Sequence, residues 1–287
     1  MRLQGIKRFH YARDVEEALS LLSSYQGRGA LLAGGLDLAR TPRGDLEGLI
    51  DITGIGLSYV REDSEGLRIG ATTTLTEVLE SPDARRYLGG FLAEVLSQVA
   101  VPPLRNQATI GGAVISAHPW ADIPTALVAL GAEARWTDEA GEHRARLEEL
   151  WAKPFRGIFR QAVLTELYLP PWQGAFAFQR LTRSTYDIAL INCACGLGVE
   201  EGKIAWARVA VGATPYRGRR LPGVEEVLVG EAPTAEIFAA AGERAAQEAR
   251  VGDDVRASAD WRRAVLPALV RRALERAAGK AVTRKRR

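Results

Sequence analysis

Apolar and polar positions in the first fifty residues predict a helix followed by two short strands. Residues 14–24 carry apolar side chains at helical spacing behind Asp14, a candidate N-cap. The run 30–35 predicts a buried strand that enters a Gly-Gly turn, and 46–53 predicts the next strand. A strand that follows a helix and ends in glycine is typical of an α/β unit whose ligand lies beyond the carboxyl end of the strand.

The middle of the chain reads as antiparallel strands interrupted by helices. A glycine turn after residue 63 separates two alternating segments, and a second turn at 139–141 separates another pair. Residues 83–100 carry a continuous helical stripe, and 123–130 predicts a short helix with Asp122 as its N-cap. The strands are expected at 57–63, 67–75, 132–147 (as a hairpin) and 162–169.

The last third predicts a small antiparallel sheet covered by helices. Three strand patterns lie at 174–181, 191–200 and 203–214, and Ala- and Arg-rich helical patterns lie at 233–250 and 258–279. Pro267 lies inside the last pattern, so we expect a kink or two short helices there. The Pro-Pro-Trp-Gln-Gly segment after residue 169 is the best candidate for a domain boundary.

Composition places the chain among globular proteins and excludes several classes. The 287 residues are 47% hydrophobic and 25% charged, with a net charge of +3 that is spread along the sequence. Dispersed charge predicts no nucleic-acid groove, and the basic run 283–287 reads as a solvated tail. No apolar run approaches the roughly 18 residues that a membrane span needs, and the N-terminus has no signal core. We therefore expect a cytoplasmic protein.

Cysteine and histidine usage predicts neither a metal site nor disulfides. Cys193 and Cys195 flank a single residue, which is the wrong spacing for a redox pair, and in a strand both side chains would point to one face. Buried thiols in a reducing compartment are the simplest interpretation. The histidines His10, His118 and His143 are scattered, without a second ligand at metal-binding spacing.

Two Gly-Gly turns carry the candidate chemistry. One lies at Gly34-Gly35 behind an apolar strand, and the other at Gly111-Gly112 behind Thr109. Glycine pairs permit close backbone approach and free N–H groups, so the two turns could grip one diphosphate from two sides. Neither is a GxGxxG fingerprint, which argues against a Rossmann domain. Asp122 follows the second turn, and helix capping alone would also explain it.

Residues 70–74 form a small, hydroxyl-rich segment that could lie close to a ligand. The alternative, a β-rich segment that leads into a helix capped by threonine, explains the pattern equally well.

Both turns, the Leu-Thr-Glu-Leu-Tyr-Leu-Pro strand that ends at residue 170 and the late segment 253–274 together resemble one family. It is the FAD-binding medium subunit of molybdenum hydroxylases, which includes carbon monoxide dehydrogenase and the flavin portion of xanthine dehydrogenase. The similarity extends over essentially the whole chain. It implies an α+β fold, with a two-part FAD-binding domain at 1–172 (a small parallel α/β part, 1–53, and a larger antiparallel part, 54–172). A C-terminal domain of a three-stranded antiparallel sheet with helices is implied at 173–287.

The resemblance further implies non-covalent FAD held mainly by backbone groups. The two Gly-Gly segments would wrap the pyrophosphate, and Asp122 would contact ribose or ribityl hydroxyls. The implied cofactor-binding residues are Leu32, Ala33, Gly34, Gly35, Leu36, Asp37, Leu38, Thr72, Thr109, Ile110, Gly111, Gly112, Ala113, Ser116, Ala117, Asp122, Leu164 and Gln179. The sequence departs from the family where Ala113 replaces a frequent Asn, Gln179 a frequent Lys, and Ile188 a frequent aromatic residue that shields the flavin.

The resemblance assigns substrate oxidation to other polypeptides. A molybdenum-cofactor large subunit and a [2Fe-2S] small subunit are the implied partners, as a dimer of heterotrimers, with electrons passing through FAD to an external acceptor. No catalytic side chain is assigned to this chain. Two alternatives stay open, a stand-alone flavin oxidoreductase and a flavin-free assembly or scaffold subunit.

Overall fold

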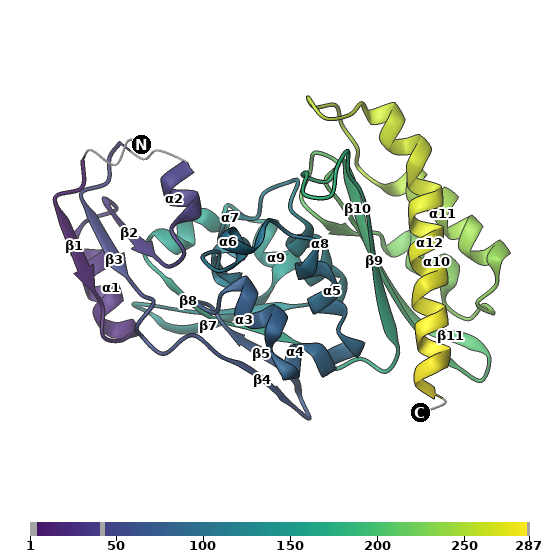
Figure 1. Cartoon of the computed structure of the whole chain (residues 1–287), viewed down its shortest axis with the longest axis horizontal. Helices are drawn as coiled ribbons and strands as arrows, with labels where there is room; N and C mark the ends of the chain where they lie inside the picture. The colour runs from purple at the N-terminus through teal and green to yellow at the C-terminus, as the bar shows by residue number, and fades with distance from the viewer. Residues whose placement is uncertain (1–4, 41–43, 286–287) are drawn as a thin grey trace. The chain divides into compact units, whose positions relative to one another are not determined.

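The computed structural model describes residues 5–40 and 44–285, with side chains described as far as residue 281. The backbone falls into two compact units (Figure 1). The first unit comprises Met1–Ala84, Val101–Ser116 and Ala132–Leu169, and the second comprises Arg85–Ala100, Ala117–Gly131 and Pro170–Arg287. Thr41 and Pro42, which follow the first Gly-Gly motif, and the end of the basic tail at Arg286 and Arg287 lie outside the described residues.

The first unit begins with a parallel three-stranded sheet in the order β1-β3-β2. Its strands are β1 (Arg8–Tyr11), β2 (Gly29–Leu32) and β3 (Gly48–Asp51). Helix α1 (Val15–Ser24) starts at Asp14, whose side chain accepts from the Glu17 N–H, as predicted. The helix buries Ala18 and Leu22 against Ile50 and Ile52, so its apolar stripe fixes it on the sheet.

A five-stranded antiparallel sheet in the order β4-β5-β8-β6-β7 forms the rest of the first unit. Its strands are β4 (Val60–Asp63), β5 (Gly66–Gly70), β6 (Glu133–Asp138), β7 (Gly141–Arg146) and β8 (Val163–Leu169). Both predicted hairpins are present, with Asp63 paired to Gly66 and Asp138 paired to Gly141. Short helices connect these strands: α2 (Leu36–Arg40), α3 (Leu75–Glu80), α6 (Pro102–Arg105), α7 (Ile110–Ser116), α9 (Leu147–Trp151) and η2 (Phe155–Arg160).

The second unit contains an antiparallel sheet in the order β12-β11-β10-β9. The strands β9 (Ala175–Leu181), β10 (Ile191–Glu200) and β11 (Lys203–Gly212) are the three predicted ones, and β12 (Arg219–Arg220) adds a two-residue edge. Together with the parallel sheet, it confirms the predicted α+β fold class. Cys193 and Cys195 are free, buried and on one face of β10, as expected.

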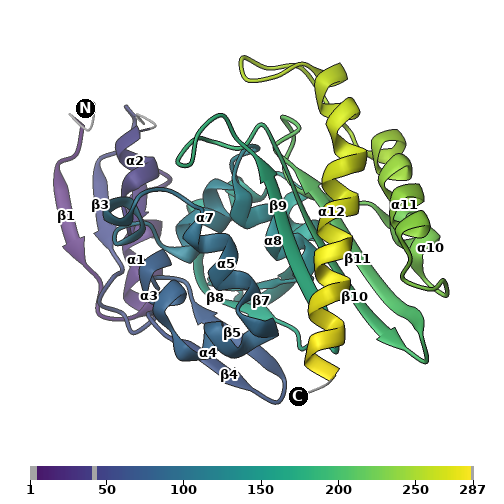
Figure 2. The same cartoon turned by 45° about the vertical axis from the view of Figure 1, so that its right-hand side comes forward.

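Helices α10 (Pro222–Leu228), α11 (Ala235–Glu248) and α12 (Ala259–Lys285) cover one face of this sheet. Figure 2 shows α12 lying along β9 and β10 with α11 beside it. Helix α12 continues through Pro267, so the predicted division into two short helices is wrong. A Cβ on Gly242 would lie 2.5 Å from the Pro267 carbonyl oxygen, which shows how closely α11 packs on α12 there. Packing along the sheet outweighs the one hydrogen bond that proline removes.

Two further helix predictions need correction. The segment 83–100 is not continuous but divides into α4 (Pro82–Arg86), η1 (Tyr87–Gly89) and α5 (Phe91–Ser97). The break lies at Gly89 and Gly90, whose φ angles of 67° and 81° are left-handed and incompatible with a helix interior. Helix α8 (Asp122–Leu130) includes Asp122 as its first residue, and its N-cap is Ala121, without a side-chain cap.

Candidate functional site

The first Gly-Gly turn joins β2 to α2 and presents backbone donors that no described residue uses. Gly35 has a left-handed φ of 70°, which glycine adopts without strain, and its carbonyl oxygen accepts from the Ala39 N–H at 2.9 Å. The N–H groups of Ala33, Gly34 and Gly35 donate no hydrogen bond to any residue that the structure describes. Three adjacent free donors on a partly exposed turn suit an anionic group.

The first Gly-Gly turn touches the segment that leads to the second one, inside the first unit. A Cβ built on Gly34 would lie 2.0 Å from the Gln107 carbonyl oxygen and 3.3 Å from the Ala108 Cα. No side chain fits between these backbones, so Gly34 is needed for the contact itself. Residues about seventy positions apart in the sequence therefore meet, as the two-sided grip requires.

The second Gly-Gly turn is different, because its N–H groups are already satisfied. Four consecutive N–H groups at the start of α7 each have an acceptor within the first unit. They run from Ile110 to the Thr73 oxygen (2.9 Å), from Gly111 to the Ala71 oxygen (3.0 Å), from Gly112 to Thr109 Oγ1 (3.1 Å) and from Ala113 to the Thr109 oxygen (3.0 Å). The expectation that this glycine pair frees its N–H groups is therefore wrong in this structure.

The hydroxyl-rich segment 71–74 runs beside the second turn. Thr74 pairs with Thr109 in an isolated antiparallel β-bridge between the two segments. Thr74 also forms a capping box with Glu77 at the start of α3. Thr72 is 5% exposed, and its Oγ1 is buried without a hydrogen-bond partner among the described residues. A buried hydroxyl without a partner costs about 1–3 kcal/mol, so it marks a place where a ligand atom would be accommodated.

Other predicted residues of the first unit lie around these turns with structural contacts. Leu164 is buried in β8 opposite Trp136, so it belongs to the core. Ser116 ends α7, where its hydroxyl donates to the Ala113 oxygen and its carbonyl oxygen accepts from Arg156. Sequence reasoning missed Arg156, because a single arginine in the short helix η2 carries no motif. Leu32 and Leu38 lie in β2 and α2.

The second unit holds the remaining predicted residues, Ala117, Asp122 and Gln179. Asp122 is 6% exposed and forms an ion pair with Arg180 on β9, at 2.5 Å between Oδ2 and Nη1. Its Oδ1 accepts from the Asn192 side chain at 2.7 Å, and Asn192 in turn accepts from the Thr125 hydroxyl at 2.8 Å. Burial raises the pKa of Asp122, and the Arg180 guanidinium and the Asn192 amide oppose that shift.

Arg180 also holds the loop between β9 and β10. Its second terminal nitrogen donates to the carbonyl oxygens of Thr185 and Asp187, at 3.0 and 3.3 Å. That loop exposes Tyr186 and Ile188, which are 67% and 43% accessible. Arg180 and Asn192 were missed from the sequence, because their partner Asp122 is about sixty to seventy residues away. Gln179, the residue that was predicted, is half-buried on β9.

The residues present fit an FAD molecule. FAD carries a diphosphate that needs hydrogen-bond donors and sugar hydroxyls that need acceptors. The first turn has free N–H donors, and Thr72 has a buried hydroxyl without a partner among the described residues. Gly112 is exposed, and a Cβ placed on it would meet only Thr109 Oγ1 within 4 Å. Asp122 supplies a carboxylate with acceptor capacity beyond its two present bonds.

Family comparisons agree with this chemistry. The family described as the FAD binding domain in molybdopterin dehydrogenase matches residues 4–172. The family described as the CO dehydrogenase flavoprotein C-terminal domain matches residues 176–277.

Individual relatives match over nearly the whole chain. The chain is 29% identical over 276 residues to the carbon monoxide dehydrogenase medium chain of Hydrogenophaga pseudoflava, covering 94% of this chain and 96% of that protein. It is 30% identical over 276 residues to the alpha subunit of the 6-hydroxypseudooxynicotine dehydrogenase complex of Paenarthrobacter nicotinovorans, with 93% and 92% covered. A solved carbon monoxide dehydrogenase from Hydrogenophaga pseudoflava, lacking the Mo-pyranopterin moiety, superposes with a TM-score of 0.89 at 28% identity, over 96% and 98% of the two chains.

Across residues 5–40 and 44–285, no helix has both the length and the apolar character needed to cross a membrane.

Proposed function

We propose that this chain, which belongs to the family of FAD-binding subunits of molybdenum hydroxylases, carries electrons from an iron–sulfur partner to an external acceptor. It is an oxidoreductase subunit with an FAD-binding domain. FAD, when bound, supplies two-electron storage and release, and the protein supplies position, electrostatics and access. The observation that carries the proposal is the turn at Gly34-Gly35, with free N–H donors in contact with the segment that leads to the second Gly-Gly turn.

The first unit is proposed to hold the diphosphate. Residues 33–38 donate backbone N–H groups to it, and the Thr72 hydroxyl bonds an atom of the ligand. Gly112, which is exposed, leaves room for the cofactor beside α7. Because the α7 N–H groups already have acceptors, residues 109–113 contribute mainly shape, and Gly112 donates only if Thr109 Oγ1 gives way.

The second unit is proposed to bind the sugar part through Asp122, and Ala117 and Gln179 are proposed as further cofactor contacts of this unit. Arg180 and the Asn192 amide favour the ionised form of the Asp122 carboxylate against the effect of burial, and they orient its two oxygens. An ionised carboxylate accepts strongly from ribose or ribityl hydroxyls, which is why the pair matters for binding.

Partner subunits are proposed to hold the other redox groups. A [2Fe-2S] cluster needs four thiolate-type ligands, and this chain has two cysteines, both buried on β10. We propose a molybdenum-cofactor large subunit and a [2Fe-2S] small subunit as partners, in a dimer of heterotrimers in the cytoplasm. The names of two relatives give two different substrates, carbon monoxide and 6-hydroxypseudooxynicotine. We therefore propose that the large subunit, and not this chain, determines the substrate. We also propose that the chain divides into an FAD-binding domain at 1–172 and a C-terminal domain at 173–287.

The test uses the chain co-expressed with its partner subunits. We expect stoichiometric FAD in the purified complex, and substrate-driven bleaching of the flavin absorbance only when the iron–sulfur subunit is present. A complex that assembles with Gly112→Val in this chain should lose FAD and acceptor reduction while its iron–sulfur clusters still become reduced. Flavin reduction by a substrate of the isolated chain would indicate a stand-alone oxidoreductase. A complex that never binds FAD would indicate a scaffold subunit.

A further inference from the structure

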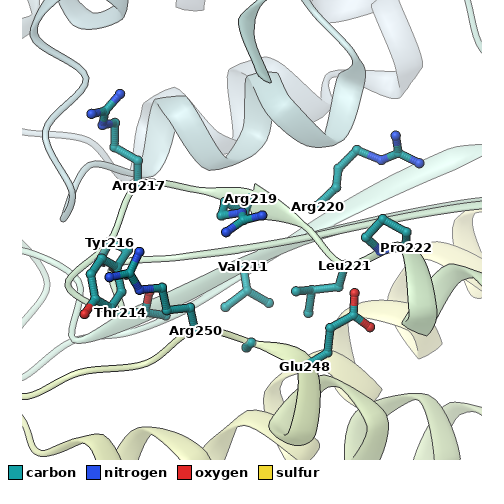
Figure 3. A pocket seen from close by; sticks show the side chains of 11 residues that line it. Val211, Thr214, Tyr216, Arg217, Arg219, Arg220, Leu221, Pro222, Glu248 and Arg250 are labelled. Carbon is teal, nitrogen blue, oxygen red and sulfur yellow. Dashed lines mark hydrogen bonds between the residues drawn. The ribbon is translucent and has the colours of Figure 1, made fainter. Parts of the chain in front are cut away.

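A cavity lies in the second unit, lined by none of the residues assigned above to FAD. It measures about 120 Å³ and opens between the β11–β12 edge and the end of α11 (Figure 3). Pockets that enclose drug-sized ligands measure about 300–1,000 Å³, so this one suits a small ion or a single charged group. It is lined by Val211, Thr214, Tyr216, Arg217, Arg219, Arg220, Leu221, Pro222, Glu248, Ala249 and Arg250.

The lining is strongly basic. Four arginines contribute to it, against one carboxylate, Glu248. Arg220 is neutralised by Glu225, to which its Nε donates at 3.0 Å and its terminal nitrogen donates as well. The Arg219 side chain forms no hydrogen bond or ion pair with any residue in the described ranges 5–40 and 44–285. The cavity therefore has an excess of positive charge.

The geometry aims two guanidinium groups at the cavity. Adjacent residues of β12 point to opposite faces, and Arg219 pairs with Val211 while Arg220 pairs with Ala210. Arg220 accordingly points away from Arg250 in Figure 3, whereas Arg219 projects on the side of Val211, on the cavity floor. The Arg250 guanidinium carbon lies 3.8 Å from the centre of the Tyr216 ring, which fixes its orientation.

The single carboxylate of the lining, Glu248, has its own contacts with Gly223 and Arg244, and its buried Oε2 accepts no hydrogen bond from a described residue. Glu248 Oε1 accepts from the Gly223 N–H at 3.2 Å, and Arg244 Nε lies 3.5 Å from Oε2. Thr214 adds a buried hydroxyl beside Tyr216, and a hydroxyl can donate to an oxyanion.

Arg219 and Arg250 are exposed, unlike two enclosed arginines of the second unit. Arg180 pairs with Asp122, and Arg262, which is 0% exposed, pairs with Asp254 at 2.9 Å. The side chain of Arg219 is exposed and has no ion-pair partner among the described residues, so an anion in solution can reach it.

We propose that this cavity, defined by Arg219, Arg250, Tyr216 and Thr214, binds the phosphate group of a small ligand. Planar guanidinium groups recognise phosphate by paired, charge-assisted hydrogen bonds, and the threonine hydroxyl completes the donor set. The site does not depend on the proposed electron-transfer role, because none of its residues contributes to the FAD site.

The experiment is calorimetric titration of the full chain, saturated with FAD, with inorganic phosphate and separately with adenosine monophosphate at constant ionic strength. We expect saturable 1:1 binding that weakens by about tenfold or more in the Arg219→Ala, Arg250→Ala double variant. The matched control is Arg271→Ala, which removes a half-exposed arginine of α12 outside the cavity and should leave binding unchanged. Tighter binding of the nucleotide would identify a phosphate ester as the ligand, and equal binding would identify the free ion.

Two outcomes would overturn the proposal. One is no saturable binding of either probe by the wild-type chain, and the other is equal weakening in the Arg271→Ala control. FAD content and the thermal unfolding midpoint of each variant are measured in parallel, so that loss of fold or of the flavin site is distinguished from loss of the phosphate site.

Discussion

The two Gly-Gly turns share a dipeptide and a fold unit but use their glycines differently. At Gly34-Gly35 the N–H groups of the turn lack partners among the described residues, and Gly35 is left-handed. At Gly111-Gly112 the N–H groups donate to residues 71 and 109, and the turn is the start of a helix. The first turn offers donors to a ligand, and the second offers a close-packed surface.

The difference shows that a glycine pair by itself does not define an anion site. Gly111 is needed because a Cβ there would lie 2.5 Å from the Ala71 carbonyl oxygen. Gly112 is exposed, and a Cβ there would meet only Thr109 Oγ1 at 3.0 Å. One glycine of the second pair is therefore structural, and the other faces the proposed cofactor.

The largest effect is expected for Gly34→Ala, which breaks the contact between the first turn and the segment that leads to the second. Its Cβ would lie 2.0 Å from the Gln107 carbonyl oxygen, and backbone cannot rotate away as a side chain can. We expect a loss of about 2 kcal/mol or more in unfolding free energy, measured by urea denaturation, and loss of nearly all bound FAD. Gly54→Ala, where a Cβ meets nothing within 4 Å, should be close to neutral. Wild-type stability of the Gly34 variant would contradict the contact.

The two glycines of the second turn should separate fold from cofactor. We expect Gly111→Ala to lower the unfolding free energy by about 1–3 kcal/mol, because the added Cβ would clash with the Ala71 carbonyl oxygen. Gly112→Val should keep the fold and lose FAD, because its side chain would occupy the exposed side of the turn. Denaturation midpoints and flavin absorbance of the purified variants give both readouts. Stoichiometric FAD in a folded Gly112→Val protein would exclude this turn from the site.

Thr109→Val tests whether the second turn mainly stabilises the fold. The substitution removes the hydroxyl that accepts from the Gly112 N–H and should cost about 1 kcal/mol of stability. FAD affinity should change less, because the freed N–H becomes available to a phosphate oxygen. Thr109→Ser keeps the hydroxyl and serves as the control in thermal unfolding and FAD titration. A large loss of FAD affinity at unchanged stability would show that Thr109 binds the cofactor directly.

The smallest effect is expected for Thr72→Val. It is also the most informative, because stability and FAD affinity should change in opposite directions. Its Oγ1 is buried without a partner among the described residues, so removing the hydroxyl should raise the stability of FAD-free protein by about 1 kcal/mol. The same change should weaken FAD binding several-fold, because the ligand loses that hydrogen bond. Unfolding of FAD-free protein and fluorescence titration with FAD measure the two signs. If stability and FAD affinity both fell or both rose, Thr72 would have no hydrogen-bond partner in the cofactor.

Much of the fold was predictable because it depends on neighbours in the sequence. Spacings of two to four residues predict three of its features: the Asp14 cap, the hairpin at 139–141, and the placement of Cys193 and Cys195 on one face of their strand. The break at Gly89-Gly90 was within reach of the same rules, since paired glycines interrupt helices.

The candidate site was less predictable, because its geometry comes from residues far apart in the chain. Asp122 looked like a helix cap, but Arg180 and Asn192, from strands β9 and β10, turn it into a buried ion pair. Nothing near Thr72 in the sequence indicates that its hydroxyl is left without a partner within the described part of the chain.

By itself, the sequence determined the α+β class, the two glycine turns and the resemblance to FAD-binding subunits, since periodicity, glycine pairs and motif order are local properties. Only the tertiary structure decided that the Gly34 backbone touches Gln107 and that the Gly111-Gly112 donors are already used. It also decided that Arg219, unpaired among the described residues, lines a cavity of its own. Those facts depend on which groups from distant parts of the chain come into contact. Each contact matters because a buried polar group without a hydrogen-bond partner costs free energy.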